Sequence, residues 1–107
     1  MADRQTDGAQ HIRTVSLKPN AGGTSEKLSV DENGDVSAAI KEGSALVSVS
    51  DDVYYRCDAD PTATNDGTDQ ILFAGGQYRI APITAGYKLA FKAPASGTSV
   101  VHITPGA

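Results

Sequence analysis

Residues 70–104, QILFAGGQYRIAPITAGYKLAFKAPASGTSVVHIT, decide how the rest of the chain is interpreted. Apolar residues recur at every second position in three successive runs, as side chains on one face of a β-strand do. Turns containing glycine or proline separate these runs. The stretch therefore predicts a β-meander, with residues 70–73 as a short lead-in strand. The runs are marked by Tyr78 and Ile80, by Tyr87, Leu89 and Phe91, and by Val101 and Ile103.

Two earlier segments predict strands joined by a tight turn. Residues 26–30 and 36–40 flank Asn33-Gly34. Asn-Gly is the strongest short hairpin signal, because both residues tolerate the left-handed backbone of a type I′ turn. We therefore expect these segments to pair as a hairpin, although residues 36–41 also permit one turn of helix.

Three further segments alternate between apolar and polar residues. Residues 11–17 predict a first strand, with Arg13, Val15 and Leu17 on one face. Residues 45–49 and 53–57 follow, separated by two aspartates. They predict either a second hairpin or one long bulged strand, and the sequence does not separate the two.

Eight or nine short strands without a helix of ordinary length predict an all-β protein. The expected architecture is an antiparallel β-sandwich, jelly-roll-like. A chain of 107 residues fits one domain. Residues 1–10 lack periodicity and almost all apolar content, so we expect an extended N-terminal arm, followed by a single domain over residues 11–107. The arm has no signal-peptide pattern, and no apolar run is long enough to span a bilayer.

Charge and cysteine content narrow the class of protein. Nine Lys and Arg against thirteen Asp and Glu give a net charge of −4, without a basic run. Direct nucleic-acid binding is therefore not expected, because a phosphate-binding surface needs clustered cations. Cys57 is the single cysteine, which excludes an internal disulfide and favours a reducing cytoplasm. Its alternation with Val53 and Tyr55 indicates a small buried hydrophobic side chain.

The longest segment without an evident apolar anchor is residues 58–69. Long loops in small domains are often functional, so this segment is the first candidate contact surface. Its carboxylates are those of Asp58, Asp60, Asp66 and Asp69. Their spacing does not match a calcium-binding EF-hand loop, and we expect a solvated or partner-facing loop, with no metal and no cofactor. No catalytic arrangement of residues stands out, and an enzyme is not expected.

Tyrosine and arginine side chains are enriched at protein interfaces, and several occur on the predicted strands. Tyr55 and Tyr78 have an equally good interpretation as core residues with hydroxyls at the rim. Arg4 in the arm and His11 at the start of the first strand complete the candidates. The expected partner-binding residues are Arg4, His11, Tyr54, Arg56, Asp58, Asp60, Asp66, Asp69, Arg79 and Tyr87.

Residues 53–104, about half of the chain, resemble small virion proteins of tailed bacteriophages. The segments that carry this resemblance are VYYRC (53–57), DPTAT (60–64), DQILFAGG (69–76), YRI (78–80), KLAF (88–91), SGT (96–98) and VHIT (101–104).

The resemblance implies a non-enzymatic decoration or cement protein on the capsid exterior. It would be made in the host cytoplasm and would bind the major capsid protein, or other virion proteins, as a homo-oligomer on the particle. A head-tail connector or a tail component that forms a ring is an alternative. A carbohydrate- or receptor-binding β-module is another, made less attractive by the absence of Trp.

Overall fold

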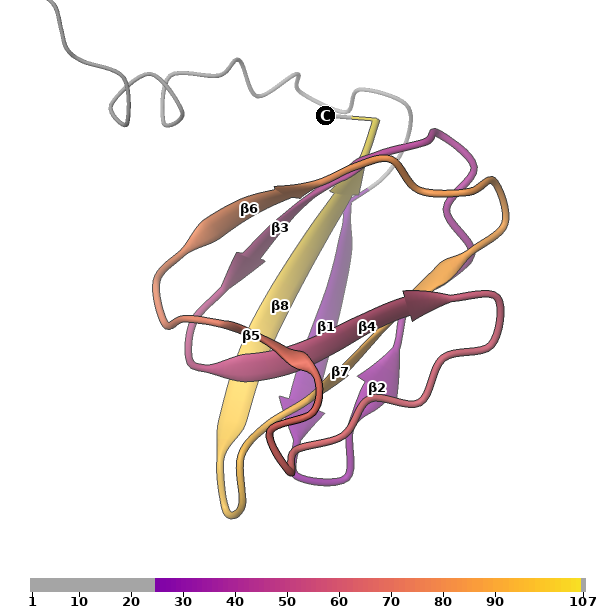
Figure 1. Cartoon of the computed structure of the whole chain (residues 1–107). Helices are drawn as coiled ribbons and strands as arrows, with labels where there is room; N and C mark the ends of the chain where they lie inside the picture. The colour runs from indigo at the N-terminus through magenta and orange to yellow at the C-terminus, as the bar shows by residue number, and fades with distance from the viewer. Residues whose placement is uncertain (1–24, 107) are drawn as a thin grey trace, which may run out of the picture.

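The computed structural model describes residues 25–106, and this range contains eight strands and no helix (Figure 1). It contains no helix of the length and apolar content that crossing a bilayer requires. The expected arm (1–10) and first strand (11–17) lie outside the described residues. The strands are β1 (Glu26–Asp31), β2 (Asp35–Val36), β3 (Ala45–Val49), β4 (Val53–Asp58), β5 (Gln70–Leu72), β6 (Gln77–Ile80), β7 (Lys88–Lys92) and β8 (Thr98–Pro105).

The strands form two four-stranded antiparallel sheets packed face to face, which confirms the expected all-β, sandwich-like fold. Sheet A has the order β1-β8-β3-β6, and sheet B has the order β2-β7-β4-β5. The pairs β1–β8, β2–β7, β3–β6 and β4–β5 are nested, as if one long hairpin had been wrapped around a core. Between β1 and β8 the chain changes sheet at every connection except the one between β4 and β5.

The core lies between the sheets and is built from the alternating residues of the central strands. In β3 the inward residues Ala45, Val47 and Val49 are at most 4% exposed, while Leu46 and Ser48 are half-buried on the outer face. Phe91 of β7 is the largest fully buried side chain. Burying a side chain of this size contributes roughly 1.5–3 kcal/mol, so these central strands supply much of the stability.

The predicted β-meander is wrong, although its strands exist. β5 and β7 belong to sheet B, whereas β6 and β8 belong to sheet A, so none of these consecutive strands pair with one another. A two-residue period identifies the face of a strand that is buried, but both sheets face the same core. The pattern is therefore the same whether the chain reverses within a sheet or crosses to the other.

The predicted hairpin around Asn33-Gly34 is also wrong. The turn itself forms, with Gly34 at φ +84° and its N–H donating to the Asp31 carbonyl at 3.1 Å. However, β1 pairs with β8 and β2 pairs with β7, so the turn carries the chain between sheets. Residues 37–39 are not helical, and Ile40 forms an isolated bridge with Tyr87.

Neither alternative for residues 45–57 is correct, because β3 and β4 lie in different sheets. The buried Ser99 fixes the crossing between them. Its hydroxyl accepts from the Asp51 N–H at 3.1 Å and donates to the Asp51 carbonyl at 2.9 Å. Val49 and Val53, on either side of the crossing, then both enter the core.

Candidate partner-binding surfaces

The loop of residues 59–69 covers part of the outer face of sheet B. Ala90 of β7 lies between two inward-facing residues and so faces outward, yet it is only 1% exposed. Pro61 and Ala63 of the loop are buried and line the same groove as Ala90. The expectation that this segment lacks an apolar anchor is therefore wrong. Sequence reasoning missed the anchor because alanine and proline side chains are too small to produce a visible apolar pattern.

Asp69 attaches the end of this loop to β4. Its side chain is 6% exposed, and its Oδ1 accepts from Arg56 Nη2 at 2.6 Å and from Arg56 Nε at 2.9 Å. Its Oδ2 accepts from the Thr64 N–H at 2.7 Å and from the Thr64 hydroxyl at 3.2 Å. Asn65 adds a bond from Nδ2 to the Ala93 carbonyl at 3.1 Å. One carboxylate thus closes the loop on itself and on the sheet.

The hydrogen bonds also set the ionisation of Asp69. Burial alone would raise the pKa of this carboxyl, but the bonds from the Thr64 N–H and the Arg56 guanidinium outweigh it and hold the pKa below its ordinary 3.8. The exposed Asp66 also has a lowered pKa, because its carboxylate accepts from the side chain and the backbone of Thr68.

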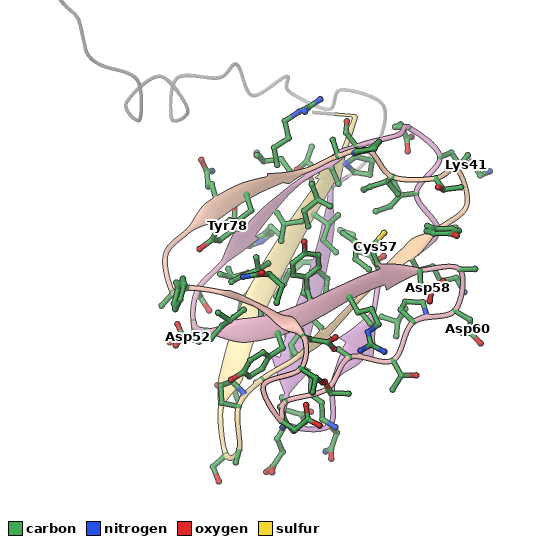
Figure 2. The ribbon with its side chains drawn as sticks, in the orientation of Figure 1. Lys41, Asp52, Cys57, Asp58, Asp60 and Tyr78 are labelled. Atoms are coloured by element: carbon green, nitrogen blue, oxygen red, sulfur yellow. The ribbon has the colours of Figure 1, made fainter. Side chains whose placement is uncertain are left out.

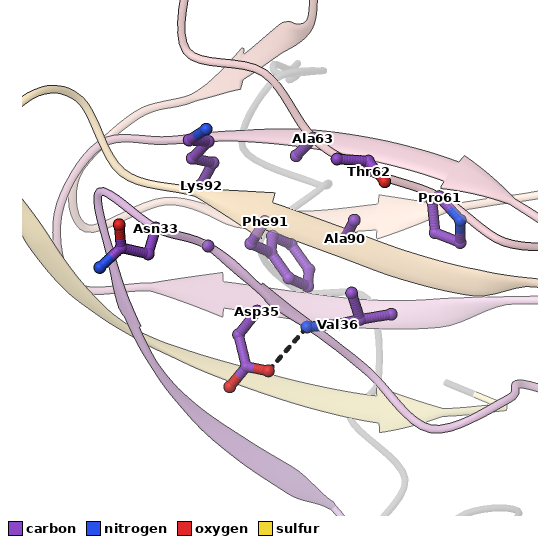
Figure 3. Close-up of a pocket in the computed structure, with 10 residues that line it drawn as sticks. Asn33, Asp35, Val36, Pro61, Thr62, Ala63, Ala90, Phe91 and Lys92 are labelled. Carbon is purple, nitrogen blue, oxygen red and sulfur yellow. Dashed lines mark hydrogen bonds between the residues drawn. The ribbon is translucent and has the colours of Figure 1, made fainter.

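A groove of about 270 Å³ lies between this loop and the strands β2 and β7, of which β2 is the edge strand of sheet B (Figure 3). Val36, which is 40% exposed, and Ala90 are among its apolar residues. Asp35 Oδ1 accepts from the Val36 N–H at 2.8 Å, so a side chain caps a donor at the edge of the sheet. Such capping makes this edge a poor template for another strand.

The opposite flank, which we call the β5–β6 flank, is the more open side of the core. We define it by Tyr55, Leu72, Tyr78 and Ile80, which line a groove of about 320 Å³ between β5 and β6. Of these, only Leu72 is buried, and the other three are half-buried against the core. Figure 2 shows Tyr78 and Asp52 on this side of the molecule, and Asp58 and Asp60 at the far end of β4.

The connection between β5 and β6 adds an exposed apolar side chain to this flank. Phe73 is 59% exposed, and its N–H donates to the Tyr78 hydroxyl at 2.9 Å. The neighbouring Ala74 N–H donates to Asp52 Oδ1 at 2.8 Å. Sequence reasoning missed Phe73 as a surface residue. Its position at the end of the predicted strand 70–73, just before Ala74-Gly75-Gly76, was the available signal.

The flank formed by β1 and β2 is closed in comparison. Leu28 is 8% exposed, Val30 1% and Ile40 2%. The Glu26 carboxylate accepts from the Ala38 N–H at 3.0 and 3.3 Å and so joins β1 to the segment that follows β2. The two sides of the sandwich therefore differ in how completely they cover the core.

The structure brings together few of the expected partner-binding residues. Arg56 and Asp69 form an ion pair, with the Arg56 side chain 42% exposed. Arg79 is exposed on β6, in the other sheet. Arg4 and His11 lie outside the described residues. Of the remaining candidates, Tyr54 and Tyr87 are half-buried, and Asp58, Asp60 and Asp66 are exposed.

No reactive or metal-binding constellation emerges among residues 25–106. No group of three or more His, Cys, Asp and Glu side chains in this range lies close enough to hold a metal ion. Burial, with a smaller contribution from Asp58, raises the pKa of the Cys57 thiol, which keeps the thiol in its unreactive, protonated form. His102 is exposed on the outer face of β8, as its position between Val101 and Ile103 predicts.

Comparison with known proteins gives no further constraint: no protein-family model, no curated protein and no solved structure matches this chain.

Proposed function

We propose that this protein is a non-enzymatic virion structural protein that binds the exterior of an assembled bacteriophage capsid and stabilises it. The domain is a jelly roll, and an extended N-terminal arm precedes it. It is made in the host cytoplasm and resides in the virion, where copies associate with one another and with the major capsid protein or other virion proteins. It contacts neither nucleic acid nor membrane directly.

The nested strand pairing is the observation that carries this proposal. Eight strands paired as β1–β8, β2–β7, β3–β6 and β4–β5 and divided between two sheets support the assignment of a jelly roll. Jelly rolls recur in viral capsid and lectin domains. Because one fold serves many functions, the pairing supports the proposal only together with the resemblance of residues 53–104 to phage virion proteins.

The described surfaces also suit contact better than chemistry. The 59–69 loop presents exposed carboxylates on a backbone that Asp69 holds in place. The β5–β6 flank presents half-buried tyrosines and the exposed Phe73. Each such contact can be weak, since many copies on one shell turn modest affinities into a durable particle.

The experiment is co-sedimentation of the purified chain with capsids assembled without it. The full chain should sediment with the capsids. A variant lacking residues 1–10 should keep the far-ultraviolet circular dichroism of the folded domain but remain in the supernatant. A variant with residues 2–10 in scrambled order is the matched control, and it should also fail to bind if the arm makes sequence-specific contacts.

Two results would count against the proposal in different ways. Failure of the full chain to sediment with capsids contradicts capsid binding itself. Full binding by the truncated chain contradicts the role of the arm and leaves the loop and the β5–β6 flank as the contact surfaces.

A further inference from the structure

We infer that the β5–β6 flank is an acceptor for an added strand, and that its occupant is residues 11–17 of a neighbouring copy of this chain. This inference goes beyond the proposed function, because it concerns contacts between copies and requires no capsid. It joins the more open flank of the described sandwich to the predicted strand over residues 11–17, which lies outside the described residues.

The acceptor combines a sheet edge with an incompletely covered core. β6 is the last strand of sheet A and β5 the last strand of sheet B, so within residues 25–106 each has a neighbouring strand on one side only. Between them, Tyr78 and Ile80 are half-buried beside the buried Leu72. In strand addition, main-chain hydrogen bonds to an edge supply affinity, and pockets for alternate side chains supply specificity. The β5–β6 flank offers both.

The donor has the alternation that such a groove selects. In residues 11–17, Arg13, Val15 and Leu17 share one face, and Thr14 and Ser16 lie on the other. With Val15 and Leu17 directed into the groove, Thr14 and Ser16 lie on the outer face of sheet A. Seven extended residues span about 23 Å, so the donor is longer than the four-residue strand β6 beside which it would lie.

The described chain begins beside one edge of sheet A and the acceptor lies at the other edge, an arrangement that suits a contact between copies. The described chain begins at Ser25, whose hydroxyl lies 2.9 Å from that of Thr104 beside β1. β1 and β6 are the two outer strands of sheet A, and three strand spacings of about 4.8 Å separate them by about 14 Å. A donor on one edge and an acceptor on the other make a head-to-tail contact, which closes into a ring when the rotation between copies permits.

The edge at β2 is a poorer acceptor. The Val36 N–H donates to Asp35 Oδ1 and the Ala38 N–H to the Glu26 carboxylate, so side chains already occupy these edge donors. Within residues 25–106, β1 also has a neighbouring strand on one side only. Pairing of residues 11–17 with β1 of their own chain would leave the β5–β6 flank open. The experiment below separates these two arrangements.

Disulfide cross-linking of the full chain tests the inference. Cys57 is replaced by Ser, Gln77 by Cys, and Ile12, Thr14 or Ser16 by Cys, one at a time, so that three donor positions cover the possible registers. Gln77 is exposed on the outer face of β6, as these three residues would be when docked. Each variant is oxidised and analysed by non-reducing gel electrophoresis and intact mass.

We expect a ladder of dimers and larger species from at least one donor position, because every copy carries one donor and one acceptor. Adding Val15→Asp and Leu17→Asp to that variant should abolish the ladder. The matched control keeps the same donor cysteine, retains Gln77 and carries the acceptor cysteine on β2 instead, as Val36→Cys. This control should remain monomeric.

Three results would overturn the inference. The first is a cross-link confined to the monomer, which places the segment on its own chain. The second is the absence of a cross-link at all three donor positions. The third is cross-linking to Val36→Cys that equals the cross-linking to Gln77→Cys. None of them bears on capsid binding, so the proposed function stands or falls separately.

Discussion

Replacing Asp69 by Asn should destabilise the domain by about 2 kcal/mol, because one carboxylate closes the 59–69 loop. The carboxylate accepts two bonds from Arg56 and two from Thr64. An Asn of the same shape retains a single acceptor oxygen, so its amide group must face one of these donors. A lost hydrogen bond to a charged group costs roughly 1.5–3 kcal/mol, and a buried donor left unsatisfied costs a similar amount.

Urea unfolding of the full chain at pH 7 measures this loss directly. The matched control is Asp66→Asn in the same loop, whose exposed carboxylate accepts only from Thr68, and it should leave the unfolding midpoint nearly unchanged. A double-mutant cycle with Arg56→Gln should give a coupling of only about 1 kcal/mol, since the Arg56 side chain is 42% exposed and water screens the pair.

The pH dependence provides a second check on the same carboxylate. The folded-state pKa of Asp69 lies below its ordinary value of 3.8. The stability it contributes is therefore fully present above the unfolded pKa of about 3.9 and is lost as the pH falls through the folded-state pKa. The difference between the wild type and Asp69→Asn should be constant from pH 7 to about pH 5 and should shrink below about pH 4. An Asp69→Asn protein as stable as Asp66→Asn, or a difference that persists unchanged at pH 2, would refute the reasoning.

Two further changes test the turns and the core. Gly34→Ala should lower the free energy of unfolding by roughly 2 kcal/mol, because the residue has φ +84° and an added Cβ would lie 2.8 Å from the Phe91 carbonyl oxygen. Gly67 has φ +92° with open space around it, so Gly67→Ala should lower the free energy of unfolding by about half as much in the same urea experiment. Phe91→Ala should cost about 3–5 kcal/mol because the side chain is fully buried, whereas Phe73→Ser, at a position 59% exposed, should change stability by less than about 0.5 kcal/mol. Comparable losses from Phe91→Ala and Phe73→Ser would contradict the placement of the core.

The sequence predicted the described strands well and their partners poorly. Alternation places Val47, Phe91 and Ile103 on buried faces, and all three are in the core. It does not record which sheet a strand joins, because inward residues of both sheets enter the same core. Asn33-Gly34 has the chemistry of a tight turn and forms one, yet the strand that follows pairs with β7. The turn residues specify a reversal, and long-range pairing decides where it leads.

The candidate surfaces could be predicted only in part, because they too depend on which distant segments lie side by side. Composition pointed to residues 58–69 and to Arg56, but not to the pairing of Arg56 with Asp69, which depends on how the loop folds back over β4. The β5–β6 flank depends on two edge strands in different sheets coming to lie side by side. No local pattern in residues 70–80 encodes that proximity.

The central claim is that this β-sandwich is a protein-binding component of a virion shell. Quantitative mass spectrometry of purified particles, with the major capsid protein as internal reference, tests it most directly. A decoration role predicts a copy number that scales with that of the major capsid protein. Absence of the chain from the particles would contradict the claim, and a copy number that matches a single ring would replace decoration with a head-tail or tail role.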